Sequence, residues 1–270
     1  MINFSEILWN PGRPKAHPRR PLPIAVADEP RNEAARHAIP TEKAYLQPDD
    51  RLALLTDSSS ASADRFRFLK MRLLELRGLT KLQTLVITSP LPEDGKSTLA
   101  TCLATALADG GKRSTLLIES DLHHPTVATS LGLSRIAGLA EALEDGGDPM
   151  RHVRKIEPLG WYLLQAGTPQ RNPTELLQSD AFGDVLRNLA PHFDWILIDT
   201  PPALPLTDAL VLSRQADATL LVARANRTPS KAIEDTIERI GRKHVLGILL
   251  NCSDGLTRLY SQYYGRYGNK

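Results

Sequence analysis

Four consecutive residues, Gly95-Lys96-Ser97-Thr98, have the residue types of a loop that binds phosphate. They follow an apolar, β-branched run at residues 84–88 and precede a helical pattern at residues 97–108. Backbone amides at a helix N-terminus can surround a phosphate, lysine can reach the β- and γ-phosphates, and the serine hydroxyl can ligate Mg²⁺. The strict form of this motif has glycine where this chain has Pro90. We expect nucleotide contacts from Pro92, Glu93, Asp94, Gly95, Lys96, Ser97 and Thr98.

Two acidic clusters follow two further apolar runs. Glu119 and Asp121 come after residues 115–118, and Asp199 comes after residues 195–198. Ligands of open α/β sheets bind at the carboxyl ends of the strands, so all three motifs should meet at one site. Asp199 has the position of a carboxylate that holds Mg²⁺ in phosphoryl-transfer enzymes. We therefore expect Ser97, Asp121 and Asp199 to hold Mg²⁺, with Lys96, Glu119, Asp121 and Asp199 as catalytic residues.

The elements that must position these residues alternate between two patterns. Short apolar runs, most of them continuous, are typical of strands buried on both faces, and they occupy residues 84–88, 115–118, 161–164, 195–198, 218–223 and 246–250. Helical patterns occupy residues 63–78, 97–108, 174–189, 206–214 and 230–242. This alternation predicts an α/β fold, a mostly parallel sheet with helices on both faces. Together with the phosphate-loop motif at residues 95–98, it predicts a fold of the P-loop NTPase type.

Proline separates the chain into segments. Eight of the 20 prolines lie in the first 50 residues, and proline lacks an amide donor and restricts φ. We expect residues 1–60 to be a disordered, proline-rich segment without helix or sheet, residues 61–254 to be the catalytic domain and residues 255–270 to be a flexible tail. A basic PxxP run at residues 13–20 could dock on a partner groove or an acidic membrane surface, or could be a solvated linker.

Composition excludes several classes of protein. The 33 basic and 31 acidic residues leave a net charge of +2, which argues against binding nucleic acid by bulk charge. Two cysteines cannot form a disulfide framework, and no apolar run reaches the roughly 20 residues of a membrane span. No secretory signal is visible, so we expect a cytoplasmic protein. The adjacent His123 and His124 do not share a helix face, which disfavours zinc.

The C-terminus concentrates tyrosine. Four of the six tyrosines, Tyr260, Tyr263, Tyr264 and Tyr267, lie in the last eleven residues. Residues 255–270 contain three basic residues and no acid, and four phosphates would bring this tail from about +3 to roughly −3 to −5. The alternative is an aromatic helix packed on the core, which Gly265 and Gly268 disfavour.

These motifs together resemble the bacterial tyrosine kinases of the capsular and exopolysaccharide biosynthesis type, over roughly residues 62–270. The matching segments are residues 88–98, residues 117–125, residues 198–202 and the stretch at residues 164–177. The resemblance implies ATP-dependent transfer of phosphate to tyrosine, with Asp121, helped by Glu119, positioning the acceptor hydroxyl and with autophosphorylation of the tail. It also implies that Asn251 contacts adenine.

The same resemblance implies partners. Asp64, Arg67 and Lys70 stand where the family has a Glu-x-x-Arg-x-x-Arg motif that packs subunits into a homo-oligomeric ring, although a solvated helix face has the same pattern. The family further implies a separate membrane adaptor of the polysaccharide co-polymerase type, tyrosine-containing protein substrates, and a peripheral location at the inner face of the plasma membrane.

Three positions depart from the family's pattern, and two other functions stay open. Glu119 stands in place of Asp, His123 in place of Arg and Glu93 in place of a common Gly. If one of these changes is disabling, the protein is a nucleotide-binding regulator without kinase activity. A partitioning ATPase of the ParA/MinD type would carry a lysine at position 91, where this chain has Leu91.

Overall fold

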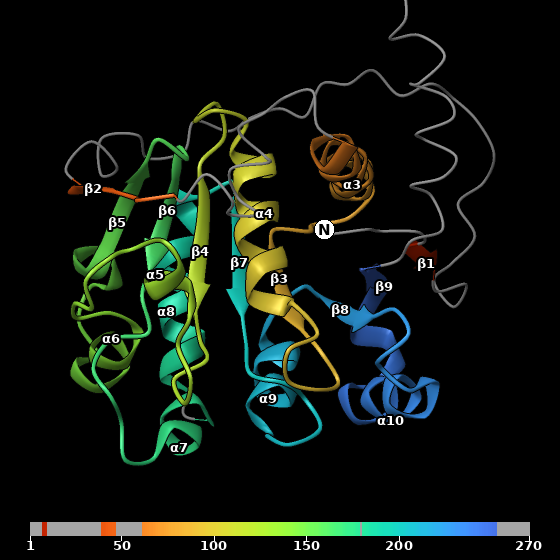
Figure 1. Cartoon of the computed structure of the whole chain (residues 1–270). Helices are drawn as coiled ribbons and strands as arrows, with labels where there is room; N and C mark the ends of the chain where they lie inside the picture. Colours follow the sequence, from red (N-terminus) through yellow and green to blue (C-terminus); the bar gives the residue numbers. More distant parts are fainter. Residues whose placement is uncertain (1–6, 10–38, 47–60, 179, 253–270) are drawn as a thin grey trace, which may run out of the picture.

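A nine-stranded sheet forms the centre of the computed structural model, which describes residues 7–9, 39–46, 61–178 and 180–252 (Figure 1). The strand order is β1-β9-β8-β3-β7-β4-β6-β5-β2. The strands are β1 (Ile7–Trp9), β2 (Thr41–Lys43), β3 (Thr84–Thr88), β4 (Thr115–Glu119), β5 (Val153–Glu157), β6 (Trp161–Leu164), β7 (Trp195–Asp199), β8 (Ala218–Arg224) and β9 (Val245–Asn251). The helices are α3 (Ala61–Leu79), α4 (Lys96–Ala108), α5 (Val127–Ser130), α6 (Leu139–Asp145), α7 (Pro173–Gln178), α8 (Ala181–Leu189), α9 (Asp208–Gln215) and α10 (Ser230–Ile240).

The centre of the sheet is parallel, as predicted. β3 pairs in parallel with β7 and β8, and β4 pairs in parallel with β6 and β7. Every residue of β3, β4 and β7 is buried, so these strands are covered on both faces. Because they run in the same direction, their carboxyl ends meet at one end of the sheet, the lower end in Figure 1.

Two helical layers bury the sheet. On one face, α3 contributes Phe66, Leu69 and Leu73 to a core shared with α4. On the other face, α6, α8 and α9 pack around Phe182 and Leu212. The predicted mostly parallel sheet with helices on both faces is therefore confirmed.

The structure contains α5 and α6, which were not predicted, and it differs from the predicted elements in two further places inside the domain. β5 was not predicted, because only two of its five residues are buried and it carries charged residues; it pairs antiparallel with β6. The single helix predicted at residues 174–189 is two helices, α7 and α8. Ser179 and Asp180 at the break are residue types that favour helix caps over helix interiors.

The prediction that residues 1–60 contain no sheet is wrong at two short strands. β1 pairs antiparallel with β9, and β2 pairs in parallel with β5, so the N-terminal segment supplies both outermost strands. Both strands lie in proline-free pieces of the segment. Pro11 is the first proline of the chain, and residues 41–47 contain no proline. Proline density over a long segment therefore does not prevent short proline-free pieces from pairing.

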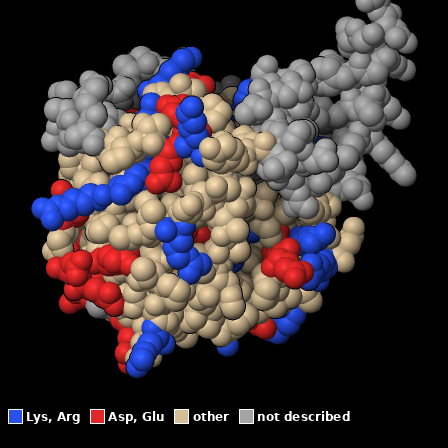
Figure 2. Space-filling model, turned by 60° about the vertical axis from the view of Figure 1, so that its left-hand side comes forward, with Lys and Arg blue, Asp and Glu red and all other residues tan. Residues whose placement is uncertain are grey.

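The surface and the helices agree with the composition. Lysine and arginine are interspersed with aspartate and glutamate among neutral residues on the face drawn in Figure 2. Among the described residues, no helix has both the length and the apolar character that crossing a membrane requires.

Candidate functional site

The phosphate loop lies between β3 and α4, as predicted. α4 begins at Lys96, directly after Gly95, whose φ of 97° lies in the left-handed region that favours glycine. Glu93 also has a positive φ, 64°, which is uncommon for a residue with a side chain. The loop thus turns sharply just before the helix, and the free amides of the first helical turn face the space where a phosphate would sit.

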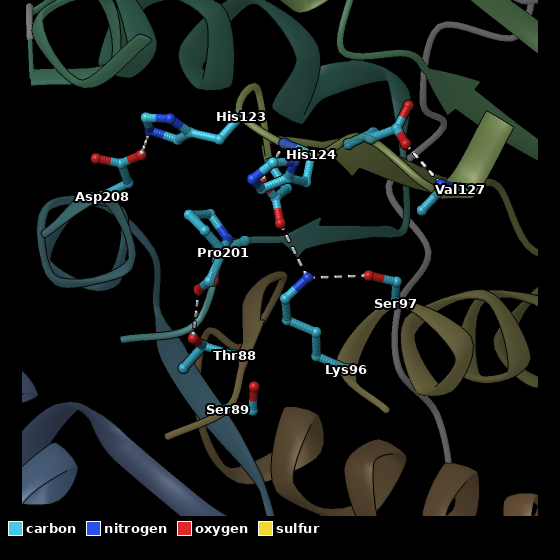
Figure 3. A network of polar contacts seen from close by, with 12 residues as sticks. Thr88, Ser89, Lys96, Ser97, His123, His124, Val127, Pro201 and Asp208 are labelled. Atoms are coloured by element: carbon cyan, nitrogen blue, oxygen red, sulfur yellow. Dashed lines mark hydrogen bonds and ion pairs between the residues drawn. The ribbon is translucent and has the colours of Figure 1, made fainter. Parts of the chain in front are cut away.

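Lys96 connects the phosphate loop to the second motif. Its Nζ lies 3.0 Å from Oδ2 of Asp121 and donates a hydrogen bond of 3.2 Å to Oγ of Ser97 (Figure 3). Burial alone would lower the pKa of Lys96, but the carboxylates of Asp199 and Asp121 more than offset this, and the pKa lies above its usual value. Lys96 therefore carries its charge at neutral pH.

Asp199 is the third motif, and it lies beside Lys96 and Ser97. It ends β7, is 1% exposed, and neither carboxylate oxygen has a hydrogen-bond partner among the described residues. Burial raises its pKa to about 7, even though the charge of Lys96 and the nearby Ser97 hydroxyl lower it. A buried carboxylate whose charge is only partly compensated is costly and suits a cation. Mg²⁺ prefers oxygen ligands and combines one or two carboxylates with phosphate and water, so Ser97, Asp121 and Asp199 fit it.

Histidine and aspartate pairs complete the rim of the site. Oδ1 of Asp121 accepts a hydrogen bond of 2.9 Å from the backbone N–H of His124. Nε2 of His123 lies 2.9 Å from Oδ2 of Asp208, which is fully buried at the start of α9. Asp208 was not predicted from the sequence, where the available signal was a Thr-Asp pair in the helical pattern that follows Asp199.

Both carboxylate oxygens of Glu119 are bound by backbone groups. Its Oε1 accepts a hydrogen bond of 2.6 Å from the N–H of Val127, and its Oε2 accepts one of 3.2 Å from the N–H of Ala166. The side chain is 1% exposed, and burial raises its pKa. Both oxygens thus bind backbone, joining the start of α5 to the segment after β6. Help to Asp121 in positioning an acceptor stays a prediction that no contact among the described residues supports.

Replacing Glu119 by Gln is expected to lower the free energy of unfolding by about 1–3 kcal/mol. The amide can accept from only one of the two N–H groups, and its own NH₂ would face the other. Thermal unfolding measures the loss. A matched control is Glu144→Gln, at an exposed position in α6, which should change stability little. Equal stability of the two variants would contradict this role for Glu119.

The loop after β8 also contacts the phosphate loop, which the sequence analysis did not predict. Arg227 forms an ion pair of 2.7 Å with Glu93, and its charge and hydrogen bond lower the pKa of that carboxyl. Oγ1 of Thr228 donates a hydrogen bond of 2.8 Å to Oδ1 of Asp94. Their place in the sequence could have indicated this contact, because they follow a predicted strand that runs parallel to the strand before the phosphate loop.

Asn251 lies under the phosphate loop. Its Nδ2 donates a hydrogen bond of 2.8 Å to the backbone oxygen of Asp94, and the residue is 2% exposed. The amide nitrogen already donates to the loop, and no contact among the described residues tests the predicted contact with adenine, which stays a prediction.

The predicted subunit-contact residues lie on α3. Arg67 forms an ion pair with Asp64 on the same helix, and Nζ of Lys70 lies 3.0 Å from Oδ1 of Asp109 at the end of α4. Their role between subunits stays a prediction. The four tail tyrosines, Tyr260, Tyr263, Tyr264 and Tyr267, lie outside the described residues.

Comparison with known proteins finds tyrosine kinases among both the similar sequences and the similar structures. No family model matches the chain. It is 32% identical over 196 residues to the tyrosine-protein kinase CpsD of Streptococcus pneumoniae, covering 70% of this chain and 86% of that protein. It is 31% identical over 200 residues to the succinoglycan biosynthesis transport protein ExoP of Rhizobium meliloti, covering 72% of this chain and only 25% of that longer protein. The kinase domain of the Escherichia coli tyrosine kinase ETK superposes with a TM-score of 0.70 at 25% identity, covering 77% of this chain and 82% of that domain.

Proposed function

The chain belongs to the bacterial tyrosine kinase family, and on this premise we propose that it transfers the γ-phosphoryl group of ATP to tyrosine. One observation carries the proposal: the ends of β3, β4 and β7 bring Lys96, Asp121 and Asp199 to one site. Lys96 and Asp121 are in contact, and the buried Asp199 raises the pKa of Lys96. A lysine held charged between carboxylates, directly after a phosphate loop, suits the transfer of a highly charged group.

Each residue of the site has a distinct task in the proposed reaction. The loop amides and Lys96 hold the β- and γ-phosphates and stabilise the charge that develops during transfer. Ser97 and Asp199 hold Mg²⁺, which supplies further positive charge when bound. Asp121 orients the acceptor hydroxyl and takes its proton late in the transfer, because free tyrosine, with a pKa near 10, is not ionised beforehand.

We further propose the substrates and partners that the family resemblance implies. The first acceptors are Tyr260, Tyr263, Tyr264 and Tyr267 of a neighbouring copy, in a ring that Asp64, Arg67 and Lys70 help to form. A separate membrane adaptor brings the kinase to the inner face of the plasma membrane and links it to exopolysaccharide synthesis and export. Its further substrates are proteins that contain tyrosine.

Incubation of the purified chain with Mg·ATP tests the proposal. Phosphate is expected on the tail tyrosines by mass spectrometry, and Lys96→Ala is expected to lower its appearance by at least about 100-fold, because this variant removes the charge that holds the transferred group. Lys112→Ala is the matched control, since Lys112 is exposed beyond the opposite end of α4.

The other functions predict different results. If the tail stays unmodified with the adaptor's cytoplasmic segment present while Mg·ATP binds, the protein is a nucleotide-binding regulator. If ATP is hydrolysed at a steady rate with no phosphotyrosine, the chain is an ATPase and the kinase proposal is wrong.

A further inference from the structure

Asp94 is the point at which the phosphate loop is fastened to the rest of the fold. Its side chain is buried, at 1% exposure, one residue before Gly95. Oδ2 accepts a hydrogen bond of 3.3 Å from the N–H of Leu91, and Oδ1 accepts one of 2.8 Å from Oγ1 of Thr228. Its backbone oxygen accepts one of 2.8 Å from Asn251. One residue of the loop thus receives hydrogen bonds from the loop itself and from two distant parts of the chain.

Thr228 is itself held in place by the end of β8. Its Oγ1 accepts a hydrogen bond of 2.8 Å from the N–H of Arg224, and its own N–H donates one of 2.9 Å to the oxygen of Arg224. The hydroxyl therefore accepts from the sheet and donates to Asp94. Because the Arg224 N–H occupies one side of Oγ1, the hydroxyl proton points toward Oδ1 of Asp94 in the loop.

Asn251 supports the loop from the neighbouring strand. It is the last residue of β9. Its backbone oxygen accepts a hydrogen bond of 2.8 Å from the N–H of Ala225, in the loop that carries Thr228. A Cβ atom added to Gly95 would lie 2.2 Å from Nδ2 of Asn251, so the two residues are in close contact. The ends of β8 and β9 thus form one support beneath the phosphate loop.

We propose that Thr228 and Asn251 are positioning residues, which act through Asp94 to hold the amides of the phosphate loop in their nucleotide-binding arrangement before the nucleotide arrives. The inference rests on the proposed function only in that the loop binds a nucleotide. Without this support the loop must be ordered during binding, and that cost lowers affinity. Once bound, the phosphates hold the same amides, so the effect falls on binding more than on transfer.

The test is the affinity of the full chain for Mg·ADP, measured by calorimetry, in Thr228→Val and Thr228→Ser. Valine keeps the shape and removes the hydroxyl, and we expect about tenfold weaker binding, the usual effect of losing a hydrogen bond to a charged group. Serine keeps the hydroxyl and is expected to bind within about twofold of the wild type. Thr236→Val is the matched control, because that hydroxyl bonds Ala232 within α10 and should leave affinity unchanged.

Two further measurements distinguish positioning from general stability. In the tail phosphorylation assay, KM for ATP should rise about tenfold in Thr228→Val while kcat stays within about twofold. Asn251→Ala should also weaken binding, and the double variant should lose less than the product of the two single losses, because both act through Asp94.

An affinity of Thr228→Val for Mg·ADP equal to that of the wild type would overturn the inference. A loss of affinity in Thr228→Ser as large as the loss in Thr228→Val would also overturn it. If Thr228→Val does not fold, Thr228→Ala takes its place in the comparison with Thr228→Ser. Binding of Mg·ADP needs no phosphoryl transfer, so failure of the kinase proposal would appear separately, as wild-type protein that binds nucleotide without forming phosphotyrosine.

Discussion

Asp199→Asn is expected to slow phosphoryl transfer strongly and at the same time stabilise the nucleotide-free protein. The carboxylate is fully buried without a hydrogen-bond partner among the described residues, so its charge is costly in the absence of a cation. Its pKa of about 7, against an ordinary value of 3.8, corresponds to a gain of roughly 2–4 kcal/mol when the charge is removed at pH 8. Loss of a charge that holds the metal should slow transfer roughly 100- to 1000-fold.

The stabilisation should depend on pH in a definite direction. Between about pH 4 and pH 7 the native carboxyl is protonated and the unfolded one is ionised, so the native state binds more protons. The free energy of unfolding of the wild type therefore falls as pH rises, by up to about 1.4 kcal/mol per pH unit from this group. Above pH 7 both states are ionised and the dependence ends. The advantage of Asp199→Asn should grow from pH 4 to pH 7 and then stay constant.

Chemical denaturation at several pH values measures this effect. Asp217→Asn is the control for the same change, because the Asp217 carboxylate accepts three hydrogen bonds, from the N–H of Gln83 and from the N–H and hydroxyl of Thr84. That variant should be less stable than the wild type. A destabilised Asp199→Asn, or an advantage that shrinks as pH rises, would contradict the account of Asp199.

Gly95→Ala is expected to lower nucleotide affinity by more than about 100-fold, through steric and conformational strain in the loop. The backbone at this position has a φ of 97°, and a Cβ atom would lie 2.2 Å from Nδ2 of Asn251. The loop must change its course to relieve the contact, and the amides that follow Gly95 then no longer converge on one phosphate. Calorimetry with Mg·ADP measures the loss.

Gly78→Ala is the matched control for this change. Gly78 lies in α3, and a Cβ atom there would meet nothing within 4 Å. Alanine in a helix is more favourable than glycine by roughly 0.5–1 kcal/mol, so this variant should be slightly more stable and bind nucleotide normally. Near-normal affinity in Gly95→Ala would show that the loop is not held as the structure has it.

The sequence predicted those parts of the fold that depend on local patterns. Strands covered on both faces require continuous apolar runs, and β3, β4 and β7 were predicted for that reason. Lys96, Asp121 and Asp199 could be placed together because each follows such a strand. β5 was missed because it is only half buried, and β1 and β2 were missed because they depend on partners far along the chain.

Side-chain directions at the site were harder to predict than positions. Glu119 was placed at the right strand end, but its carboxylate binds the N–H of Ala166, 47 residues away. Thr228 and Asp208 carry no motif of their own, and their contacts arise from the way separate loops pack. The sequence therefore predicted the strand ends of the site but not the loops that join them.

The pairing of the N-terminal segment with both outermost strands bears on aggregation. β1 covers part of β9, and β2 covers part of β5, so their N–H and C=O groups are satisfied within the chain. A shortened chain that begins at residue 61 would expose both edges, and exposed strand edges can pair with other chains. Residues 7–9 and 41–43 replace the edges of β9 and β5 with edge strands of only three residues each, which are expected to lower non-specific association, so a chain that keeps them is the better material for studying which assembly it forms.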